Sequence, residues 1–129
     1  MIKQVINVDN KWKVIVYYNI DYNLFRYVAD ELRSIGVRER CIRRIAYLSF
    51  TGEVKAFTLT SFSLGVSVVG FNYHRNIKDY INSIVHEAEH VKQHMLEAYC
   101  VADKDEPPAY TIGFLASKMM MFFLKMLQK

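Results

Sequence analysis

Residues 76–99 have the sequence NIKDYINSIVHEAEHVKQHMLEAY, and this segment decides the fold that we expect. Apolar side chains recur along it at the three- and four-residue spacing of one helix face. They are Ile77, Ile81, Ile84, Ala88, Val91 and Met95. Asn76 precedes the first apolar position and is a candidate N-cap. The pattern therefore predicts a helix over 77–99 that packs on a core through this stripe.

His86, Glu87 and His90 form the pattern H-E-x-x-H inside the predicted helix. Residues four apart lie on the same helix face, so His86 and His90 can offer two imidazole nitrogens to one Zn²⁺. Glu87 would then take a proton from a zinc-bound water. At about 100° per residue, both histidines lie away from the apolar stripe. The competing interpretation is an ordinary solvated face, shared with Lys92, Gln93 and Glu97.

A catalytic zinc site needs a third protein ligand and one open position for water. The candidates are His94, Glu89, Glu97, Asp103, Asp105 and Glu106. His94 lies two turns from His86, roughly 12 Å along the axis, which is too far for one ion. Glu106 fits best because it opens a second predicted helix, whose antiparallel return would place its first turn near the end of the first. A helix N-terminus also favours the ionised carboxylate.

Five stretches have strand composition, and we expect strands at 5–8, 13–18, 45–50, 54–60 and 66–71. Thr51-Gly52 predicts a tight hairpin between the third and fourth of them. The strand over 66–71 leads into the H-E-x-x-H helix. If it lies at a sheet edge, its free backbone groups could pair with an extended peptide.

Two further helices complete the prediction. One begins at Asp21, a candidate cap, and ends at Gly36. The other begins at Glu106-Pro107-Pro108 and continues to Leu127, with core-facing positions 112, 115, 116, 119, 122, 123 and 126. This order of elements predicts an α+β fold with a mostly antiparallel sheet, formed by residues 1–129 as a single domain.

The composition is that of a soluble globular protein, with 52% hydrophobic and 23% charged residues among 129. Cys41 and Cys100 are too few and too far apart for a disulfide framework, so we expect thiols. The first residues lack a signal-peptide pattern, so we expect a cytoplasmic protein. Residues 109–127 are apolar, but Ser117, Lys118 and Lys125 interrupt them, which favours a core helix over a membrane span.

Two motifs together resemble a known family. The H-E-x-x-H helix followed by Glu106 on a second helix is similar to the gluzincin zinc metallopeptidases. The segment 105–110, DEPPAY, with Gly113 also resembles short metallopeptidase-like proteins of phages and mobile elements. The resemblance implies that His86, His90 and Glu106 bind Zn²⁺ and that Glu87 is the general base. The gluzincin acidic residue that orients a metal histidine is missing, since Ala109 and Tyr110 occupy that region.

Three functional hypotheses follow. The leading one is a zinc-dependent peptidase acting on peptides or proteins, and the second is a catalytically inactive zincin-like binding protein. The third is a nucleic-acid-binding module that uses Arg33, Arg38, Arg40, Arg43 and Arg44. Glu31 and Glu39 interleave with that cluster, so we expect a solvated basic loop and no nucleic-acid partner. The Met119–Phe123 run exceeds one helix face, which is compatible with a homodimer.

Overall fold

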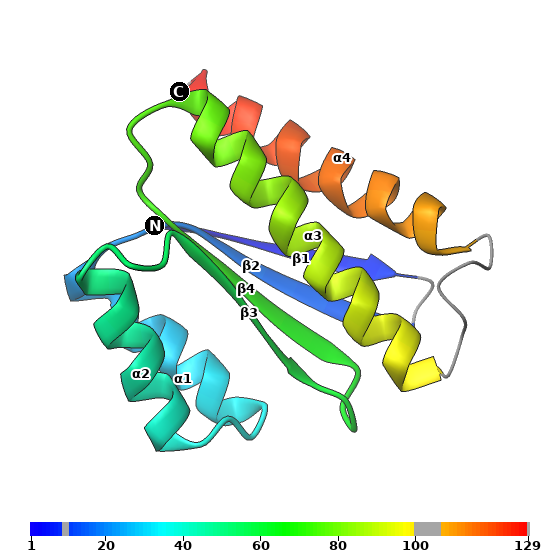
Figure 1. Cartoon of the computed structure of the whole chain (residues 1–129), viewed down its shortest axis with the longest axis horizontal. Helices are drawn as coiled ribbons and strands as arrows, with labels where there is room; N and C mark the ends of the chain where they lie inside the picture. Colours follow the sequence, from blue (N-terminus) through cyan, green and yellow to red (C-terminus); the bar gives the residue numbers. More distant parts are fainter. Residues whose placement is uncertain (9–10, 100–106, 129) are drawn as a thin grey trace.

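The computed structural model of the chain describes residues 1–8, 11–99 and 107–128. Its elements, in chain order, are β1 (Ile2–Val8), β2 (Trp12–Ile20), the short 3-10 helix η1 (Tyr22–Leu24), α1 (Phe25–Ser34), α2 (Glu39–Phe50), β3 (Ala56–Ser61), β4 (Val66–Asn72), α3 (Ile77–Tyr99) and α4 (Pro107–Leu127). They form three layers, with α1 and α2 on one face of the sheet and α3 and α4 on the other (Figure 1). The predicted α+β class is confirmed.

The sheet has the strand order β1-β2-β4-β3. β1 pairs with β2 and β3 pairs with β4 in antiparallel fashion, whereas β2 and β4 are parallel. The expectation of a mostly antiparallel sheet is therefore confirmed. The order also places β4 inside the sheet and β3 at an edge, so the proposal that the strand over 66–71 is an edge strand is wrong.

Two hydrophobic clusters lie on the two faces of the sheet. Along β2, Val14, Val16 and Tyr18 face α3 and α4, whereas Ile15 and Tyr17 face α1 and α2. Side chains alternate between the faces of a strand, so a strand covered on both sides is apolar at nearly every position. This explains why β2 has a continuous apolar sequence.

Helix α3 has the predicted bounds and most of the predicted stripe. Ile84, Ala88, Val91 and Met95 are buried against the sheet and α4. Ile77, by contrast, is 51% exposed, because the helix begins beyond the end of the sheet. Asn76 caps the helix as expected, since its Oδ1 accepts a hydrogen bond of 2.9 Å from the backbone N–H of Asp79.

Residues 45–50 belong to helix α2, so the predicted strand there is wrong. A short apolar run does not distinguish a strand from a buried helix turn. In the structure, Ile42 is buried and Ile45 and Ala46 pack beside it at helical spacing. Thr51-Gly52 consequently ends a helix and makes no hairpin. The hairpin in this region joins β3 to β4 instead, where Gly65 adopts a φ of 65°.

The other predicted helices are confirmed. The Asp21 side chain accepts a hydrogen bond of 3.0 Å from the N–H of Leu24 at the start of η1. In α4, Leu115, Met119 and Phe123 are buried, as their spacing predicted. Cys41 is a free thiol, and Cys100 lies outside the described residues. Among the helices that the structure describes, none combines the length and apolarity that a bilayer crossing requires.

Gly70 of β4 lies against Phe57 of β3 and Ile20 of β2, and it tests the packing on the α1–α2 face of the sheet. A Cβ at this position would overlap the Phe57 ring and lie 2.8 Å from Cδ1 of Ile20. We expect Gly70→Ala to reduce the free energy of unfolding by about 1–3 kcal/mol in urea denaturation, and Phe57→Leu to reduce that cost. Gly113→Ala is the control, because nothing lies within 4 Å of its Cβ. It should stabilise by about 0.5–1 kcal/mol. Equal effects of the two substitutions would contradict the packing described.

Candidate metal and catalytic site

His86 and His90 lie one turn apart on the outer side of α3, and both side chains are exposed. Their rings are nearly perpendicular, and the two Nε2 atoms lie 3.0 Å apart. Two ligand nitrogens with bonds of 2.0–2.1 Å at a tetrahedral angle would lie about 3.3 Å apart. The pair therefore fits two neighbouring corners of a zinc site with little rearrangement. Without a metal, one ring nitrogen donates a hydrogen bond to the other.

Glu87 points from α3 toward the edge strand β3. The side chain is only 4% exposed, and its Oε1 accepts a hydrogen bond of 2.8 Å from Oγ1 of Thr58. Thr58 faces α3 because it is paired with Val69, whose side chain belongs to the core beneath α3. A buried carboxylate is unfavourable unless it has hydrogen-bond partners. Thr58 supplies one, and so holds the Glu87 carboxylate in a defined position.

A cavity of about 450 Å³ lies beside this pair of residues. It is lined by the start of β3 with the residues before it, and by the first half of α3, as Val54, Lys55, Ala56, Asp79, Asn82, Ser83, His86 and Glu87. An imidazole ligand and a carboxylate therefore face the same space. A cavity of this volume lies within the range of small-molecule and peptide side-chain pockets.

The third ligand is not identified among the described residues. Within residues 1–8, 11–99 and 107–128, no group of three His, Cys, Asp or Glu side chains could hold a metal ion. His94 is engaged elsewhere, since its Nδ1 lies 2.7 Å from Oγ1 of Thr60, and Glu89 binds Lys92 and Gln93. The predicted ligand Glu106 lies outside the described residues, as do Asp103 and Asp105.

A chain of polar contacts between α3 and the sheet was not predicted. Thr60 contacts both His94 and, at 2.8 Å, the hydroxyl of Ser67, which also accepts from the Trp12 indole N–H at 3.0 Å. Burial lowers the pKa of His94, so its neutral form is favoured at this contact. The sequence carried one sign of this arrangement, namely threonines at alternate positions 58 and 60 of a strand.

Although His86, His90 and Glu97 are exposed, as a solvated helix face predicts, Lys92 is not. It is 6% exposed, and its Nζ lies 2.7 Å from Oε1 of Glu89. A lysine this deeply buried requires a paired charge. The side of α3 that carries Lys92 is therefore packed. Only some of the polar residues of α3 that a solvated face would expose are in fact exposed.

His74 and Ser83 form a second contact at the rim of the cavity. His74 Nδ1 lies 2.6 Å from the carbonyl oxygen of Asn72, and its Nε2 lies 2.8 Å from Oγ of Ser83. A carbonyl can only accept, so Nδ1 carries the hydrogen and the Ser83 hydroxyl donates to Nε2. Ser83 lies within a helix whose backbone N–H groups are already bonded, so no oxyanion hole adjoins it. The pair ties the β4–α3 connection to α3 and is not a nucleophilic dyad.

A peptidase also needs a donor that stabilises the oxyanion, for which the sequence offers Tyr73, His74, Tyr99 and Tyr110, and among the described side chains none is identified in that role. Tyr73 is exposed, and His74 is occupied by the contacts above. The side chains of Tyr99 and Tyr110 lie outside the described part of the chain. The cavity does contain Lys55, whose Nζ lies 3.6 Å from Oδ2 of Asp79.

Thr58→Val tests whether the threonine hydroxyl supports Glu87. The variant keeps the branched strand side chain but leaves a buried carboxylate oxygen without its donor. We expect a loss of about 1–3 kcal/mol in the free energy of unfolding, measured by urea denaturation. Thr58→Ser keeps the hydroxyl and should lose clearly less. A valine variant as stable as the serine variant would mean that this hydrogen bond does not hold Glu87.

His74 predicts an acid-sensitive fold. Burial lowers the pKa of His74 in the folded chain. Below the ordinary histidine pKa of about 6.5, the unfolded chain therefore binds a proton at this residue more readily than the folded chain does. Stability should therefore fall as the pH drops from 7 to 5, by at most about 1.4 kcal/mol per pH unit from this one group. His74→Gln should flatten the curve of unfolding free energy against pH, whereas Arg75→Gln should not. Parallel curves for wild type and His74→Gln would contradict the assignment.

Comparisons with known proteins returned no relative. No protein-family model, curated protein or solved structure matches the chain. The resemblance to gluzincins therefore depends on residues 86–90 and 106–113 alone. Any function has to be argued from the arrangement of His86, His90, Glu87 and the cavity beside them.

Proposed function

We propose that this protein is a zinc-dependent peptidase of the cytoplasm that hydrolyses peptide bonds beside the edge strand β3. The observation that carries the proposal is a pair of imidazole nitrogens 3.0 Å apart, of which His86 lines the same cavity as the buried carboxylate of Glu87. An ordinary solvated helix face does not require a histidine pair beside a buried glutamate. A catalytic site requires them together.

His86 and His90 would hold the metal through Nε2, and Glu106 is the proposed third ligand. When bound, Zn²⁺ lowers the pKa of a coordinated water toward neutrality and polarises the substrate carbonyl. The exposure of both rings supports this assignment, because ligand atoms must be reachable by an ion from solvent. Among the described residues, the ring contacts of both histidines are with other histidines of α3, so each ring can adjust toward an ion.

Glu87 would act as the general base and then as the general acid. Its carboxylate would accept the proton of the attacking water and deliver that proton to the leaving amine. The Thr58 hydroxyl occupies Oε1, which leaves the other carboxylate oxygen for this exchange. Thr58 is therefore a positioning residue: it fixes the orientation of the base and does not itself touch the substrate.

The edge strand supports a peptide as the substrate. Within the described part of the chain, β3 pairs with β4 alone, so its outer backbone N–H and C=O groups can pair with an extended chain. Ala56 at the start of β3 lines the cavity together with His86 and Glu87. A peptide laid along β3 would therefore pass the proposed metal ligands and the base.

A zincin-like protein that binds metal or a partner without catalysis is the second candidate. The absence of a third ligand among the described residues favours it over the peptidase if Glu106 does not bind metal. Two histidines alone hold zinc weakly, and weak occupancy does not support turnover. The two candidates differ in one observable, which is peptide cleavage that depends on Glu87.

Zinc content and cleavage of a peptide library test the proposal together. Wild type should contain about one zinc per chain, and His86→Ala, His90→Ala and Glu106→Ala should lose most of it. Glu87→Gln should keep the metal and lose at least about 100-fold in cleavage rate, since general-base catalysis contributes that much. Glu53→Gln, in the exposed connection before β3, is the matched control and should change neither property.

Three results would overturn parts of this proposal. Full zinc in Glu106→Ala would move the third ligand to Asp103 or Asp105. Stoichiometric zinc without cleavage of any library peptide would select the binding protein. Cleavage by Glu87→Gln at the wild-type rate would exclude the proposed general base.

A further inference from the structure

Helix α2 is the most exposed helix element of the α1–α2 layer. Of its twelve residues, only Ile42 is buried. Ile45 and Ala46 pack beside it on the core, so the opposite side of the helix faces solvent. A short connection over 35–38 joins α2 to α1, and Gly36 there has a φ of 90°. Such a helix, presented on the surface after a tight turn, can enter a groove of another molecule.

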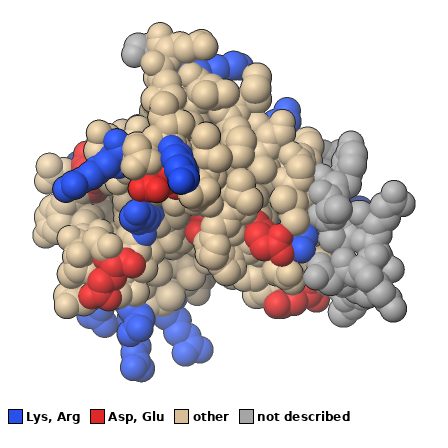
Figure 2. All heavy atoms as spheres, turned by 45° about the horizontal axis from the view of Figure 1, so that its top comes forward, with Lys and Arg blue, Asp and Glu red and all other residues tan. Residues whose placement is uncertain are grey.

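The solvent side of α2 is basic. Arg38, Arg40, Arg43 and Arg44 are all exposed, and three of them share one helix face by their spacing. Figure 2 shows basic side chains projecting at the lower left, on the side where Figure 1 places α1 and α2. Tyr47, 64% exposed, continues the same face one turn later. No described carboxylate forms an ion pair with these four arginines.

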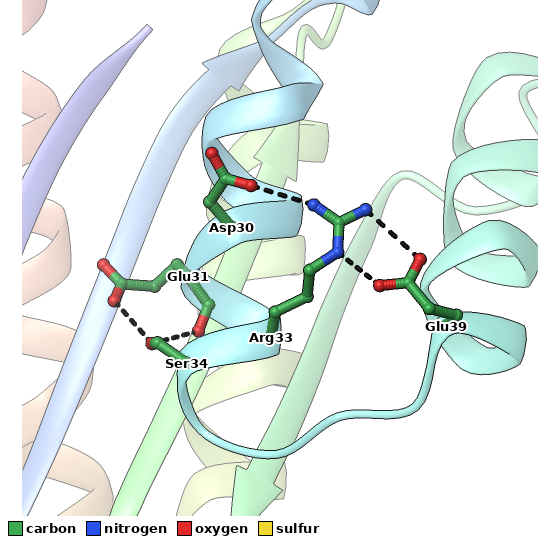
Figure 3. Close-up of polar contacts among 5 residues, drawn as sticks. All are labelled: Asp30, Glu31, Arg33, Ser34 and Glu39. Atoms are coloured by element: carbon green, nitrogen blue, oxygen red, sulfur yellow. Dashed lines mark hydrogen bonds and ion pairs between the residues drawn. The ribbon is translucent and has the colours of Figure 1, made fainter.

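The two acidic residues that argued against an anionic partner point elsewhere. Glu39 is held by Arg33, which also donates to Oδ1 of Asp30 at 2.8 Å (Figure 3). The Arg33 hydrogen bond lowers the pKa of Glu39, and Arg43 adds a smaller effect. Glu31 is bound to Lys3 and Tyr17 on the sheet side. Glu31 therefore does not neutralise the outer face of α2, and Glu39, paired mainly with Arg33, offsets it only in part through Arg43.

We propose that the Arg38–Tyr47 face of α2 binds duplex DNA by lying in the major groove. An α-helix with its side chains is about 10–12 Å across, and the major groove of B-DNA is about 12 Å wide. The face from Arg40 to Tyr47 extends about 10 Å along the helix, enough for several phosphate and base contacts. The major groove of duplex RNA is too deep and narrow for a helix, which selects DNA.

A membrane surface fits the same residues less well. A helix that lies in a bilayer interface inserts its apolar side between the lipids. The apolar side of α2, formed by Ile42, Ile45 and Ala46, is already packed on the protein. The free side carries the arginines together with Tyr47 and, at the helix end, the 40% exposed Phe50, and this predominantly charged side suits a groove lined by phosphates.

Fluorescence anisotropy with a labelled duplex of about 20 base pairs tests the proposal, at about 50 and 200 mM NaCl. The variant R40Q/R43Q/R44Q should weaken binding at least tenfold and reduce the salt dependence by about three in log–log slope. The control K78Q/K118Q/K125Q removes the same charge from exposed positions on α3 and α4, and should stay within about threefold of wild type. R40K/R43K/R44K should keep the salt dependence, and circular dichroism checks the fold of each variant.

Equal losses in the two glutamine variants would overturn the proposal, because binding would then follow net charge and not α2. Undetectable binding of wild type at about 100 μM protein and low salt would do the same. So would α2-dependent binding to vesicles of phosphatidylcholine with phosphatidylserine but not to DNA. His86→Ala/His90→Ala should bind DNA like wild type, which keeps this test independent of the peptidase proposal.

Discussion

The packing of α3 on the sheet determines where His86, Glu87 and His90 point. Ile84, Ala88 and Val91 lie against the core that Val69 and Phe71 of β4 form. This dry contact fixes the rotation of the helix about its axis. In this rotation Glu87 points toward β3, whereas His86 and His90 lie on the solvent-exposed side of the helix. The chemistry proposed for the H-E-x-x-H pattern depends on this apolar contact, because the rotation of the helix brings His86 and Glu87 to one cavity.

The polar contacts between α3 and β3 are the second constraint. Thr58 and Thr60 occupy alternate positions of an edge strand, so both face the helix and meet Glu87 and His94. Burying a carboxylate costs free energy unless donors compensate it. A glutamate at this position is a poor choice for stability alone, whereas glutamine or an apolar residue would pack with less desolvation. Such an arrangement is more typical of a functional site than of a core.

The long periodic segments were predictable, and the short apolar one was not. Helix α3 repeats its pattern over six turns, and α4 over nearly as many, so their bounds agreed with the structure. Residues 45–50 are too few to distinguish the two-residue repeat of a strand from the 3.6-residue repeat of a helix. In the structure this segment is helical, and the helix packs on the core through Ile42. The sequence also predicted that His86 and His90 share a helix face, and their Nε2 atoms lie 3.0 Å apart, whereas the roles of the pair and of Glu87 stay predictions. The sequence did not predict the contact of Thr58 with Glu87, because that contact depends on the register of β3 against β4.

Neighbours in sequence can belong to different surfaces, and the acidic residues near the arginines illustrate the consequence. In the sequence, Glu31 and Glu39 lie among the arginines and lower the net positive charge of the segment. In the structure, Glu31 binds Lys3 and Tyr17 on the sheet side, and Glu39 binds Arg33 at the turn. Local charge density is set by side-chain direction, which the α1–α2 turn fixes. The four-stranded sheet separates this basic surface from α3 (Figure 1). A ligand on α2 would therefore not compete with a peptide beside β3, so the proposed hydrolytic centre and the proposed DNA-binding face are compatible in one small chain.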